Sequence, residues 1–504
     1  MQQIFATVVC IASLALGVGA MAPTGLDIND PVSIRSVAST IAYGTMSYYT
    51  GNITNAPETI GIFPPPHYWW QAGACWGAML DYSHYTGETS YDSVTRQALL
   101  SQVGPQYDFM VPRYHGSEGN DDQAFWAFAI LDAAEHNFPQ PDSSIPPWLK
   151  MAENIWNSMV PRWDDTSCGG GLRWQIFADN PNGLDYKAAV ANGGFFQMSA
   201  RLARATGNDT YLGWAEKVWD WSQDIGLINK NFDVLDGASS REECKKINPV
   251  SFSYSQGIYM YGAAMLFNHT GGNRIWAHRT NGLLQAARSY FSPFPNATNI
   301  MYEHACEPYG TCNTDMKSFK GYLSRFMAKT AQMMPSTRHD VEELLRASAV
   351  AAAKTCSGGD HGTSCGQKWY VGGYDGNTGL GQQMTALETV QALLAFAAKP
   401  PLGAGQIRHV SSSTTSMPWT TTVSVVPSTG RTTTLTLTRT TTRSRIIFPS
   451  RLTTSPVTSN TSSAPPPTDL PTDSQESVAH TRILFFLNLI LALLSLIMAF
   501  VVDL

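Results

Sequence analysis

The feature that most constrains the fold is a Thr-Gly dipeptide that recurs along the chain at multiples of about 60 residues. Thr86-Gly87, Thr206-Gly207 and Thr270-Gly271 are each followed by a large residue four positions after the glycine. Glycine can end a helix in a left-handed cap, and the polar residues after it can begin the next helix. The two missing positions of the repeat, 143–147 and 335–337, also have sequences typical of turns and helix starts. The repeat therefore predicts helical hairpins of about 60 residues each.

Helical periodicity divides the segments between about 27 and 398 into two kinds. In 149–159, 211–221 and 341–351 the apolar residues lie on one face, whereas 124–131 and 259–267 are apolar nearly all round. Helices of the second kind must be covered on every side. About twelve helix candidates make six hairpins, which predicts an all-α fold with a closed double ring of inner and outer helices. An open solenoid is the alternative, but it would need polar capping repeats that the sequence lacks.

The two ends of the chain differ from this helical part. Residues 1–20 contain an apolar run followed by small residues, which predicts a secretory signal peptide. Residues 403–482 are rich in Ser, Thr and Pro and poor in aromatic residues, which is typical of a disordered, O-glycosylated stalk. The apolar run 483–502 predicts either the hydrophobic tail of a GPI signal, which we favour, or a transmembrane helix. The globular domain is therefore expected over 21–402.

Sequons and cysteines agree with a secreted protein. Four Asn-x-Ser/Thr sequons in the expected domain are candidate glycosylation sites: Asn52, Asn208, Asn268 and Asn296. An oxidising compartment favours disulfides. Short spacing in the sequence predicts the pairs Cys306–Cys312 and Cys356–Cys365, and the remaining pair is then Cys168–Cys244. Cys75, in an apolar stretch, is expected to be a buried free thiol. The sequence has neither Cys-x-x-Cys nor His-x-x-x-His, so we expect no metal site and no cofactor.

Composition excludes some partners and favours others. Charged residues make up 14% of the chain and the net charge is −6, so no basic surface indicates nucleic acid. Aromatic residues make up 11%, which suits both a large core and a surface that stacks against sugars.

Asp121 and Asp122 are the strongest candidates for chemistry. They follow Gly119-Asn120 at the start of a helix that is apolar all round. Such a string is also typical of an ordinary helix start, where Asn and Asp act as caps. A closed ring, however, leaves a cleft where the loops enter the inner helices. When two carboxyl groups lie as near to each other as these neighbours do, their repulsion raises the pKa of one and leaves the other ionised. Cleavage of a glycosidic bond with retention needs that division between an acid and a nucleophile about 5 Å apart.

The string from Gly119 to Trp126 resembles the paired-aspartate motif of glycoside hydrolase family 76, a family of α-1,6-mannanases that includes GPI-anchored fungal cell-wall proteins. The resemblance extends, in order, to 68–74, 168–175, 192–196, 254–257 and 319–325, and so covers roughly 27–400. It implies an (α/α)6 barrel and a retaining mechanism with Asp121 as nucleophile and Asp122 as acid/base. Gln71 departs from the pattern, because close fungal relatives are expected to have an acid there.

Further residues are expected to contact the sugar: Trp69, Trp70, Asn120, Gln123, Asn192, Tyr254, Gln256 and Asp233. Structural roles compete with each of these assignments. The glycines after Asn192 indicate close helix packing, and Trp69 and Trp70 suit a core. Asp233 and Asp236 both lie in 231–237, a sequence typical of a loop or short hairpin, where either could bind sugar but a turn role is favoured. Tyr254 and Gln256 could equally be buried and hydrogen-bonded.

The sequence therefore predicts an enzyme that acts on α-1,6-linked mannose, either in mannan or in the mannose of a GPI glycan core. The anchored branch of the family implies transfer to an acceptor such as wall glucan, in a protein that is secreted and anchored by a lipid to the outer face of the plasma membrane or to the wall. A non-catalytic carbohydrate-binding or adhesive wall protein is the main alternative. A lyase or epimerase would need a Tyr or His base with a basic cluster, which the region 100–125 lacks.

Overall fold

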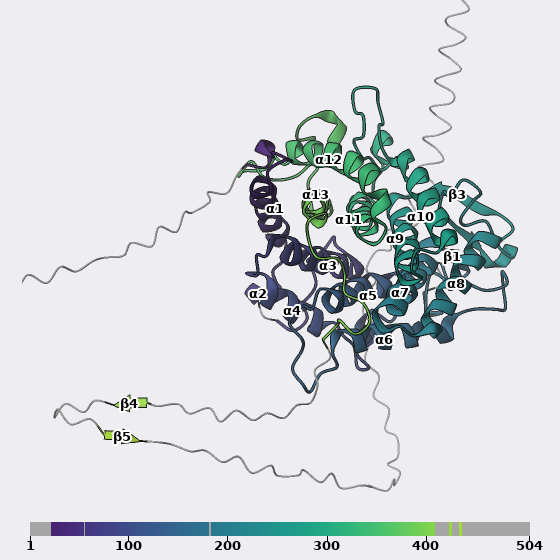
Figure 1. The fold of residues 1–504 in the computed structure, drawn as a ribbon, viewed down its shortest axis with the longest axis horizontal. Helices are drawn as coiled ribbons and strands as arrows, with labels where there is room; N and C mark the ends of the chain where they lie inside the picture. Colours follow the sequence, from purple (N-terminus) through teal and green to yellow (C-terminus); the bar gives the residue numbers. More distant parts are fainter. Residues whose placement is uncertain (1–21, 55, 181–182, 409–422, 426–432, 436–504) are drawn as a thin grey trace, which may run out of the picture. The chain divides into compact units, whose positions relative to one another are not determined.

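The computed structural model describes residues 22–54, 56–180 and 183–408, and the backbone of 423–425 and 433–435. Two groups of α-helices alternate along the first unit of the chain (Figure 1). The first group is α3 (Trp69–Thr86), α5 (Asn120–Glu135), α7 (Ala189–Thr206), α9 (Ser253–His269), α11 (Phe319–Met333) and α13 (Leu380–Ala395). The second group is α1 (Pro31–Met46), α4 (Asp92–Ser101), α6 (Trp148–Met159), α8 (Asp209–Asp224), α10 (Arg274–Ala287) and α12 (Arg338–Thr355). The four-residue helix α2 (Gly51–Thr54) lies between α1 and α3.

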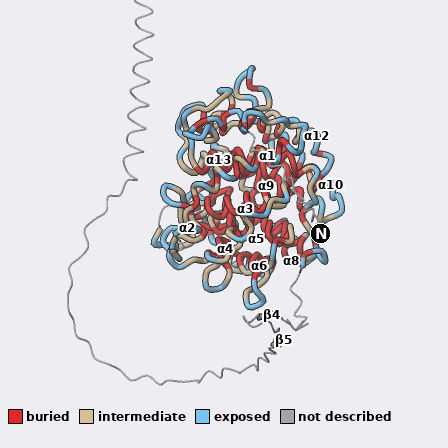
Figure 2. The backbone as a smooth tube through the Cα atoms, turned by 90° about the vertical axis from the view of Figure 1, so that its left-hand side faces the viewer, coloured by how far each residue is buried: buried red, intermediate tan, exposed pale blue. Residues whose placement is uncertain are grey.

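The first group forms a closed inner ring, because each of its helices packs on the next and α13 returns to pack on α3. The second group lies outside it, and each outer helix packs on an inner one (Figure 1). The last inner helix, α13, is covered by the first outer helix, α1. The structure thus confirms the all-α double ring of six hairpins, the (α/α)6 barrel. Buried residues are concentrated in the middle of this unit and exposed ones at its loops (Figure 2).

The Thr-Gly repeat ends inner helices as predicted. Gly87 after α3 and Gly207 after α7 have left-handed φ values of 75° and 74°, and Gly271 follows the end of α9 at 66°. The segment 143–147 lies in the connection from α5 to α6, and the segment 335–337 lies in the connection from α11 to α12. Because these connections are short, the long loops all lie at the opposite end, where the chain enters the inner helices.

A three-stranded antiparallel sheet is the main departure from the predicted all-helical pattern in the described part of the chain. It consists of β1 (Tyr186–Ala188), β2 (Leu235–Ser239) and β3 (Ile247–Ser251), in that order. The sheet lies on the loops before α7 and α9, and the disulfide Cys168–Cys244 joins the loop before β1 to the β2–β3 connection. The predicted pairs Cys306–Cys312 and Cys356–Cys365 are also formed, and Cys75 is a buried free thiol.

The inner ring also contains a network of buried charges past the middle of its helices. Arg201 on α7 contacts Asp132 at 2.6 Å and Glu135 at 2.7 Å, both on α5. Lys329 on α11 contacts Asp132 at 2.6 Å and Asp81 on α3 at 2.9 Å. All five side chains are at most 1% exposed. Burial alone would strongly disfavour these charges, and the pairing offsets that cost.

The end of the domain lies slightly beyond the predicted boundary at 402. The Leu402 N–H donates to Glu135 O, the Ala404 N–H donates to Arg204 O, and Ile407 is buried. Residues 403–408 therefore pack on the barrel and are not part of the stalk. In the second unit, β4 (Val423–Val425) and β5 (Thr433–Leu435) pair antiparallel. The predicted signal peptide, the apolar run 483–502 and most of the stalk lie outside the described residues, and no described helix has the length and apolarity to cross a bilayer.

Candidate active site

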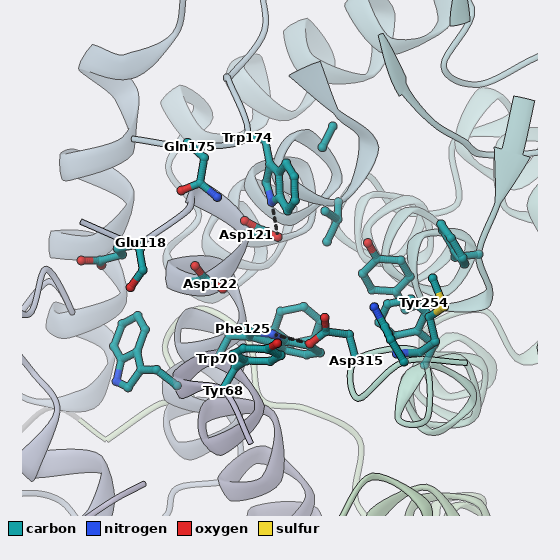
Figure 3. Close-up of a pocket in the computed structure, with 18 of the residues that line it drawn as sticks. Tyr68, Trp70, Glu118, Asp121, Asp122, Phe125, Trp174, Gln175, Tyr254 and Asp315 are labelled. Atoms are coloured by element: carbon teal, nitrogen blue, oxygen red, sulfur yellow. Dashed lines mark hydrogen bonds between the residues drawn. The ribbon is translucent and has the colours of Figure 1, made fainter. Parts of the chain in front are cut away.

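A cavity of about 490 Å³ opens at the end of the barrel where the loops enter the inner helices. Its walls come from the first turns of α3, α5, α7, α9 and α11 and from the loops that precede them. Asp121 and Asp122 both line it. Figure 3 shows their carboxyl groups between Trp174 on one side and Phe125 and Trp70 on the other.

The start of α5 fixes both carboxylates. Asp122 Oδ2 accepts a hydrogen bond from the Gly119 N–H at 2.6 Å, so this side chain caps its own helix. A side chain at Gly119 would collide with the Asp121 carboxylate, so the close approach requires glycine. The Asn120 N–H donates to Trp174 O at 2.9 Å, and this bond brings the loop that carries Trp174 over the aspartates.

Trp174 contacts the catalytic candidate directly. Its indole N–H donates to Asp121 Oδ2 at 2.8 Å, and 38% of the residue remains exposed (Figure 3). Its loop is held from below by Lys187, which is fully buried and donates to the carbonyls of Asp164 at 2.9 Å and Ser167 at 2.7 Å and also to that of Gly170. The glycine-rich string 168–171 allows this tight path, because its three glycines have positive φ.

The two aspartates differ in their protonation. Burial raises the pKa of Asp121 to about 6, and the indole N–H and the N–H groups of the first helical turn limit that rise. Burial together with the neighbouring charge of Asp121 raises the pKa of Asp122 well above its usual range. Asp122 therefore keeps its proton to higher pH than Asp121, and Asp121 is the first of the pair to ionise.

Aromatic side chains form the floor and sides of the cavity. Trp70 packs on Phe125 with ring centroids 4.6 Å apart, and Tyr254 stacks on Phe319 at 3.9 Å. Trp69 touches the cavity but is 8% exposed and belongs mainly to the core. Phe125 and Phe319 are buried beneath Trp70 and Tyr254, which are half-buried, and ring faces that line a cavity suit the apolar faces of a sugar.

Three further acids line the cavity: Glu118, Asp236 and Asp315. Asp315 Oδ1 accepts from the Trp70 indole at 3.2 Å, and burial raises its pKa to about 6. Asp236 on β2 accepts from the Tyr186 hydroxyl at 2.6 Å, and burial raises its pKa. Burial also raises the pKa of Glu118, to about 8. Among the described residues that line the cavity there is no lysine or arginine.

The family model described as Glycosyl hydrolase family 76 matches residues 33–405. The chain belongs to this family. Proteins similar to this family 76 chain include those named mannan endo-1,6-alpha-mannosidase DCW1 in Candida glabrata and Saccharomyces cerevisiae. The first is 44% identical over 381 residues, which are 75% of this chain and 83% of the relative. The second is 45% identical over 367 residues, which are 72% of this chain and 80% of the relative.

Solved structures of family 76 agree with this assignment. The crystal structure of Dfg5 from Chaetomium thermophilum, in complex with glucosamine, matches with a TM-score of 0.72 and 38% identity, covering 76% of this chain and 95% of Dfg5. An inactive variant of an α-1,6-mannanase from Salegentibacter sp., in complex with α-1,6-mannotriose, matches with a TM-score of 0.56 and 19% identity. That match covers 72% of this chain and 99% of the mannanase, and it shows a common fold.

Four amide residues that we expected to contact the sugar hold loops of the family 76 cavity instead: Asn120, Gln123, Asn192 and Gln256. None of them lines the cavity, and each is at most 1% exposed. Asn192 accepts from the Leu172 N–H at 2.8 Å and donates to Leu172 O at 3.0 Å, so it supports the Trp174 loop. Asn120 donates to Arg173 O in the same loop.

Gln123, Gln256 and Asp233 also bond to protein groups and do not line the cavity, contrary to the sequence-based prediction. Gln123 donates to Asp108 O at 2.6 Å, and Gln256 bonds the backbone of Phe232 and Val234. Asp233 lies in a turn, where it accepts from the Asn229 side chain at 2.9 Å and does not reach the cavity. Its neighbour Asp236 lines the cavity instead.

Sequence reasoning also missed several lining residues: Glu118, Trp174, Gln175, Tyr186 and Asp315. Trp174 and Gln175 lie in the string 168–175 that carries the family resemblance, and an aromatic residue beside a glycine-rich loop was the available signal. Gln71, which departs from the family pattern, is buried and donates to Thr314 O at 3.2 Å. It therefore positions the segment that carries Asp315.

Proposed function

We propose that this chain cleaves α-1,6-mannosidic linkages with retention through Asp121 and Asp122. The observation that carries the proposal is the pair of adjacent carboxyls that line one cavity, where burial and the charge of Asp121 raise the pKa of Asp122 well above its usual range. Relatives that are 44–45% identical are named mannan endo-1,6-alpha-mannosidases, which supports the linkage.

In the first step, ionised Asp121 attacks the anomeric carbon, and a covalent glycosyl ester forms while the bond to the leaving oxygen breaks. Asp122 gives its proton to that oxygen. Because the Gly119 N–H occupies Asp122 Oδ2, Oδ1 carries the proton. In the second step, Asp122 takes a proton from the incoming hydroxyl, which attacks the anomeric carbon and releases Asp121. Water as the attacking group gives hydrolysis, and a sugar hydroxyl gives transfer.

The acid-lined cavity also favours a substrate that contains an amino sugar next to mannose. Five carboxyls face it without a balancing lysine or arginine among the described lining residues. Burial raises the pKa of Asp121 and of Asp315 to about 6, so these two are ionised at neutral pH, whereas the higher pKa values of Glu118 and Asp122 keep those two groups protonated. An ammonium group on the sugar would supply that balance. The Dfg5 structure contains glucosamine, which carries such a group. A GPI glycan core, which contains both mannose and glucosamine, therefore fits better than plain mannan.

We further propose that the protein acts outside the cell, where the predicted signal peptide, stalk and GPI signal would place it at the plasma membrane or wall. There a wall glucan would be the acceptor in a transfer reaction. The aromatic side chains that line the cavity, such as Trp70 and Tyr254, support binding of a sugar acceptor, because a ring face can pack on the apolar face of a sugar.

Retention and transfer can be tested together with α-1,6-mannobiosyl fluoride. Proton NMR of the first turnovers is expected to show the α-anomer of mannobiose, and mass spectrometry with a β-glucan oligosaccharide present is expected to show a product extended by mannobiose. The β-anomer appearing first would contradict double displacement. Binding of the fluoride without turnover would support the adhesive alternative.

Trp174→Phe is expected to shift the acid limb of the pH–kcat/KM profile to higher pH. Activity requires ionised Asp121, so it falls as the pH drops through about 6. The indole N–H stabilises the ionised form, and its removal raises the pKa of Asp121 further. Trp163→Phe is the matched control, because the Trp163 indole donates to Asp165, outside the cavity, at 2.7 Å. An unchanged acid limb in Trp174→Phe would contradict the role of this hydrogen bond.

A further inference from the structure

Aromatic side chains gather at the surface where the α10–α11 and α12–α13 connections meet. The Phe294 and Tyr370 rings pack edge to face at 5.4 Å, and Tyr302 packs on Tyr370 at 6.4 Å. Phe294 is nevertheless 48% exposed, and the adjacent Val371 is 51% exposed. We call Phe294, Tyr302, Tyr370 and Val371 the aromatic patch. It is not among the residues that line the active-site cavity.

Both connections that carry the aromatic patch are held rigidly. The disulfides Cys306–Cys312 and Cys356–Cys365 close a loop in each of them. Buried Lys320 joins the two connections, because it contacts Glu307 in one at 2.7 Å and donates to Gln367 O in the other at 2.7 Å. These bonds hold the two connections together, and the ring contacts between Phe294, Tyr370 and Tyr302 join the aromatic patch across them, so a ligand that covers the patch would have less surface to order.

A sequon lies in the same turn as Phe294. The Ala297 N–H donates to Phe294 O at 2.9 Å, which defines a β-turn with Pro295 and Asn296 at its centre. The Thr298 hydroxyl, which completes the sequon, donates to Pro295 O at 3.4 Å. Asn296 is exposed, and its side chain has no hydrogen bond within the described part of the chain. The turn thus exposes the Asn296 side-chain amide, to which a glycan could be attached, two residues after the half-exposed ring of Phe294.

The other three described sequons lack this combination. The Asn208 side chain caps α8 by accepting from the Thr210 N–H. Asn268 accepts from Arg204 and donates to Met333 O, so both of its amide atoms are engaged. Asn52 is exposed in α2, but Thr50 occupies the position that Phe294 holds relative to Asn296.

We propose that Asn296 carries an N-linked glycan and that its first N-acetylglucosamine packs on Phe294 and covers the aromatic patch. In the attachment, the Asn296 Nδ2 forms a bond to the anomeric carbon of an oligosaccharide carried on a lipid diphosphate. The bond from that carbon to the diphosphate breaks, the lipid diphosphate leaves, and the amide loses one proton. A pyranose has an apolar face of C–H groups, which gains by covering exposed ring area. Covalent attachment keeps this sugar at a high effective concentration beside the ring, which a free glycan lacks.

Occupancy can be measured on the secreted protein from a eukaryotic host. Trypsin releases the peptide 289–317, which is bounded by Arg288 and Lys317 and contains no sequon besides that of Asn296. Mass spectrometry is expected to find this peptide glycosylated, and to find it unmodified in Thr298→Ala. An unmodified peptide in the unsubstituted secreted protein would overturn the proposal.

Contact with the ring can be tested by a double-mutant cycle in thermal unfolding. Asn296→Gln is expected to lower the midpoint by roughly 1–3 °C when Phe294 is present and to have no effect in Phe294→Ala. Asn52→Gln is the control, and its effect should be the same in both backgrounds. Trimming the native glycan to its first sugar should keep the higher midpoint. Equal effects of Asn296→Gln in both backgrounds would overturn the contact.

A free polysaccharide is the other source of sugar for this surface. If the aromatic patch bound one, Asn296→Gln would be retarded in a gel that contains β-glucan or mannan, and Phe294→Ala would abolish the retardation. That result would assign the patch to a free glycan and overturn the proposal. We expect equal mobility of Asn296→Gln and the Asn296→Gln/Phe294→Ala protein.

Discussion

Asp121→Asn and Asp122→Asn are each expected to abolish turnover of α-1,6-mannan, with the fold retained. Loss of the nucleophile should reduce kcat by about 10⁴-fold or more, because an amide cannot form the glycosyl ester that the proposed mechanism requires. Loss of the acid should reduce kcat by about 10²–10⁴-fold for a substrate with a sugar leaving group. Circular dichroism and the thermal midpoint should change little, since the amide of Asn can still accept the same hydrogen bonds.

The two variants can be told apart by a substrate that needs no acid. Fluoride leaves without a proton, so Asp122→Asn should still react with α-1,6-mannobiosyl fluoride and accumulate the glycosyl ester, which intact-protein mass spectrometry detects. Asp121→Asn should react with neither substrate. The reverse result would exchange the roles of the two aspartates.

Asp209→Asn is the matched control for the pair. Asp209 also lies in the first turn of a helix, α8, but it lies on the outer ring and away from the cavity. This variant should keep the kcat of the unsubstituted protein. Wild-type turnover in Asp121→Asn or Asp122→Asn would refute the assignment of the active site.

The double ring could be predicted because its signals are local. Gly87 and Gly207 end inner helices in left-handed caps, and a cap can be recognised within a few residues. The sheet could not be predicted, because strands of three to five residues are too short to show alternation. Its strand β2 is what brings Asp236 and not Asp233 to the cavity, so the unpredicted sheet decides between two acids that the sequence left equivalent.

The site could be predicted only where neighbouring residues act together. Asp121 and Asp122 are adjacent in sequence and in the cavity. Asn192 and Gln256 are different, because an amide in the first turns of an inner helix can bond either a sugar or a loop. Only the path of the loop decides between them, and the loop residues that they bond, such as Leu172, are far away in the sequence. Asp315 was missed for the same reason, since its indole partner Trp70 is 245 residues away.

The network of buried charges in the inner ring could not be predicted from the sequence either. The sequence predicts inner helices that are apolar all round, and the segment 124–131 and all of 259–267 except the half-buried Phe267 are indeed buried. Each inner helix other than α9, however, also contributes one or two buried charges at or past its middle, and so few charges per helix hardly disturb the apolar pattern. The pairing becomes visible only when the ring closes and α5, α7 and α11 meet.

Arg201→Met is expected to lower the free energy of unfolding by about 3–5 kcal/mol, because it leaves Asp132 and Glu135 buried with less compensating charge. For a domain of this size that corresponds to a fall of about 4–6 °C in the thermal midpoint, measurable by calorimetry. Arg96→Met is the matched control. It breaks a surface pair with Asp142, in which the side chains are 33% and 80% exposed, and should cost at most about 1 kcal/mol.

Two further measurements distinguish lost charge from lost packing in Arg201→Met. Arg201→Lys keeps the charge without the forked donors, so it should lose less stability than Arg201→Met. The deficit of Arg201→Met should also shrink as the pH falls toward about 4, because the unpaired carboxyls then take up protons. In the unsubstituted protein the pairing of Asp132 with Lys329 and Arg201 lowers its pKa, so its stabilising contribution is present above the usual Asp pKa. A deficit that is constant with pH, and equal in Arg201→Lys, would mean that the arginine acts by filling space and not by its charge.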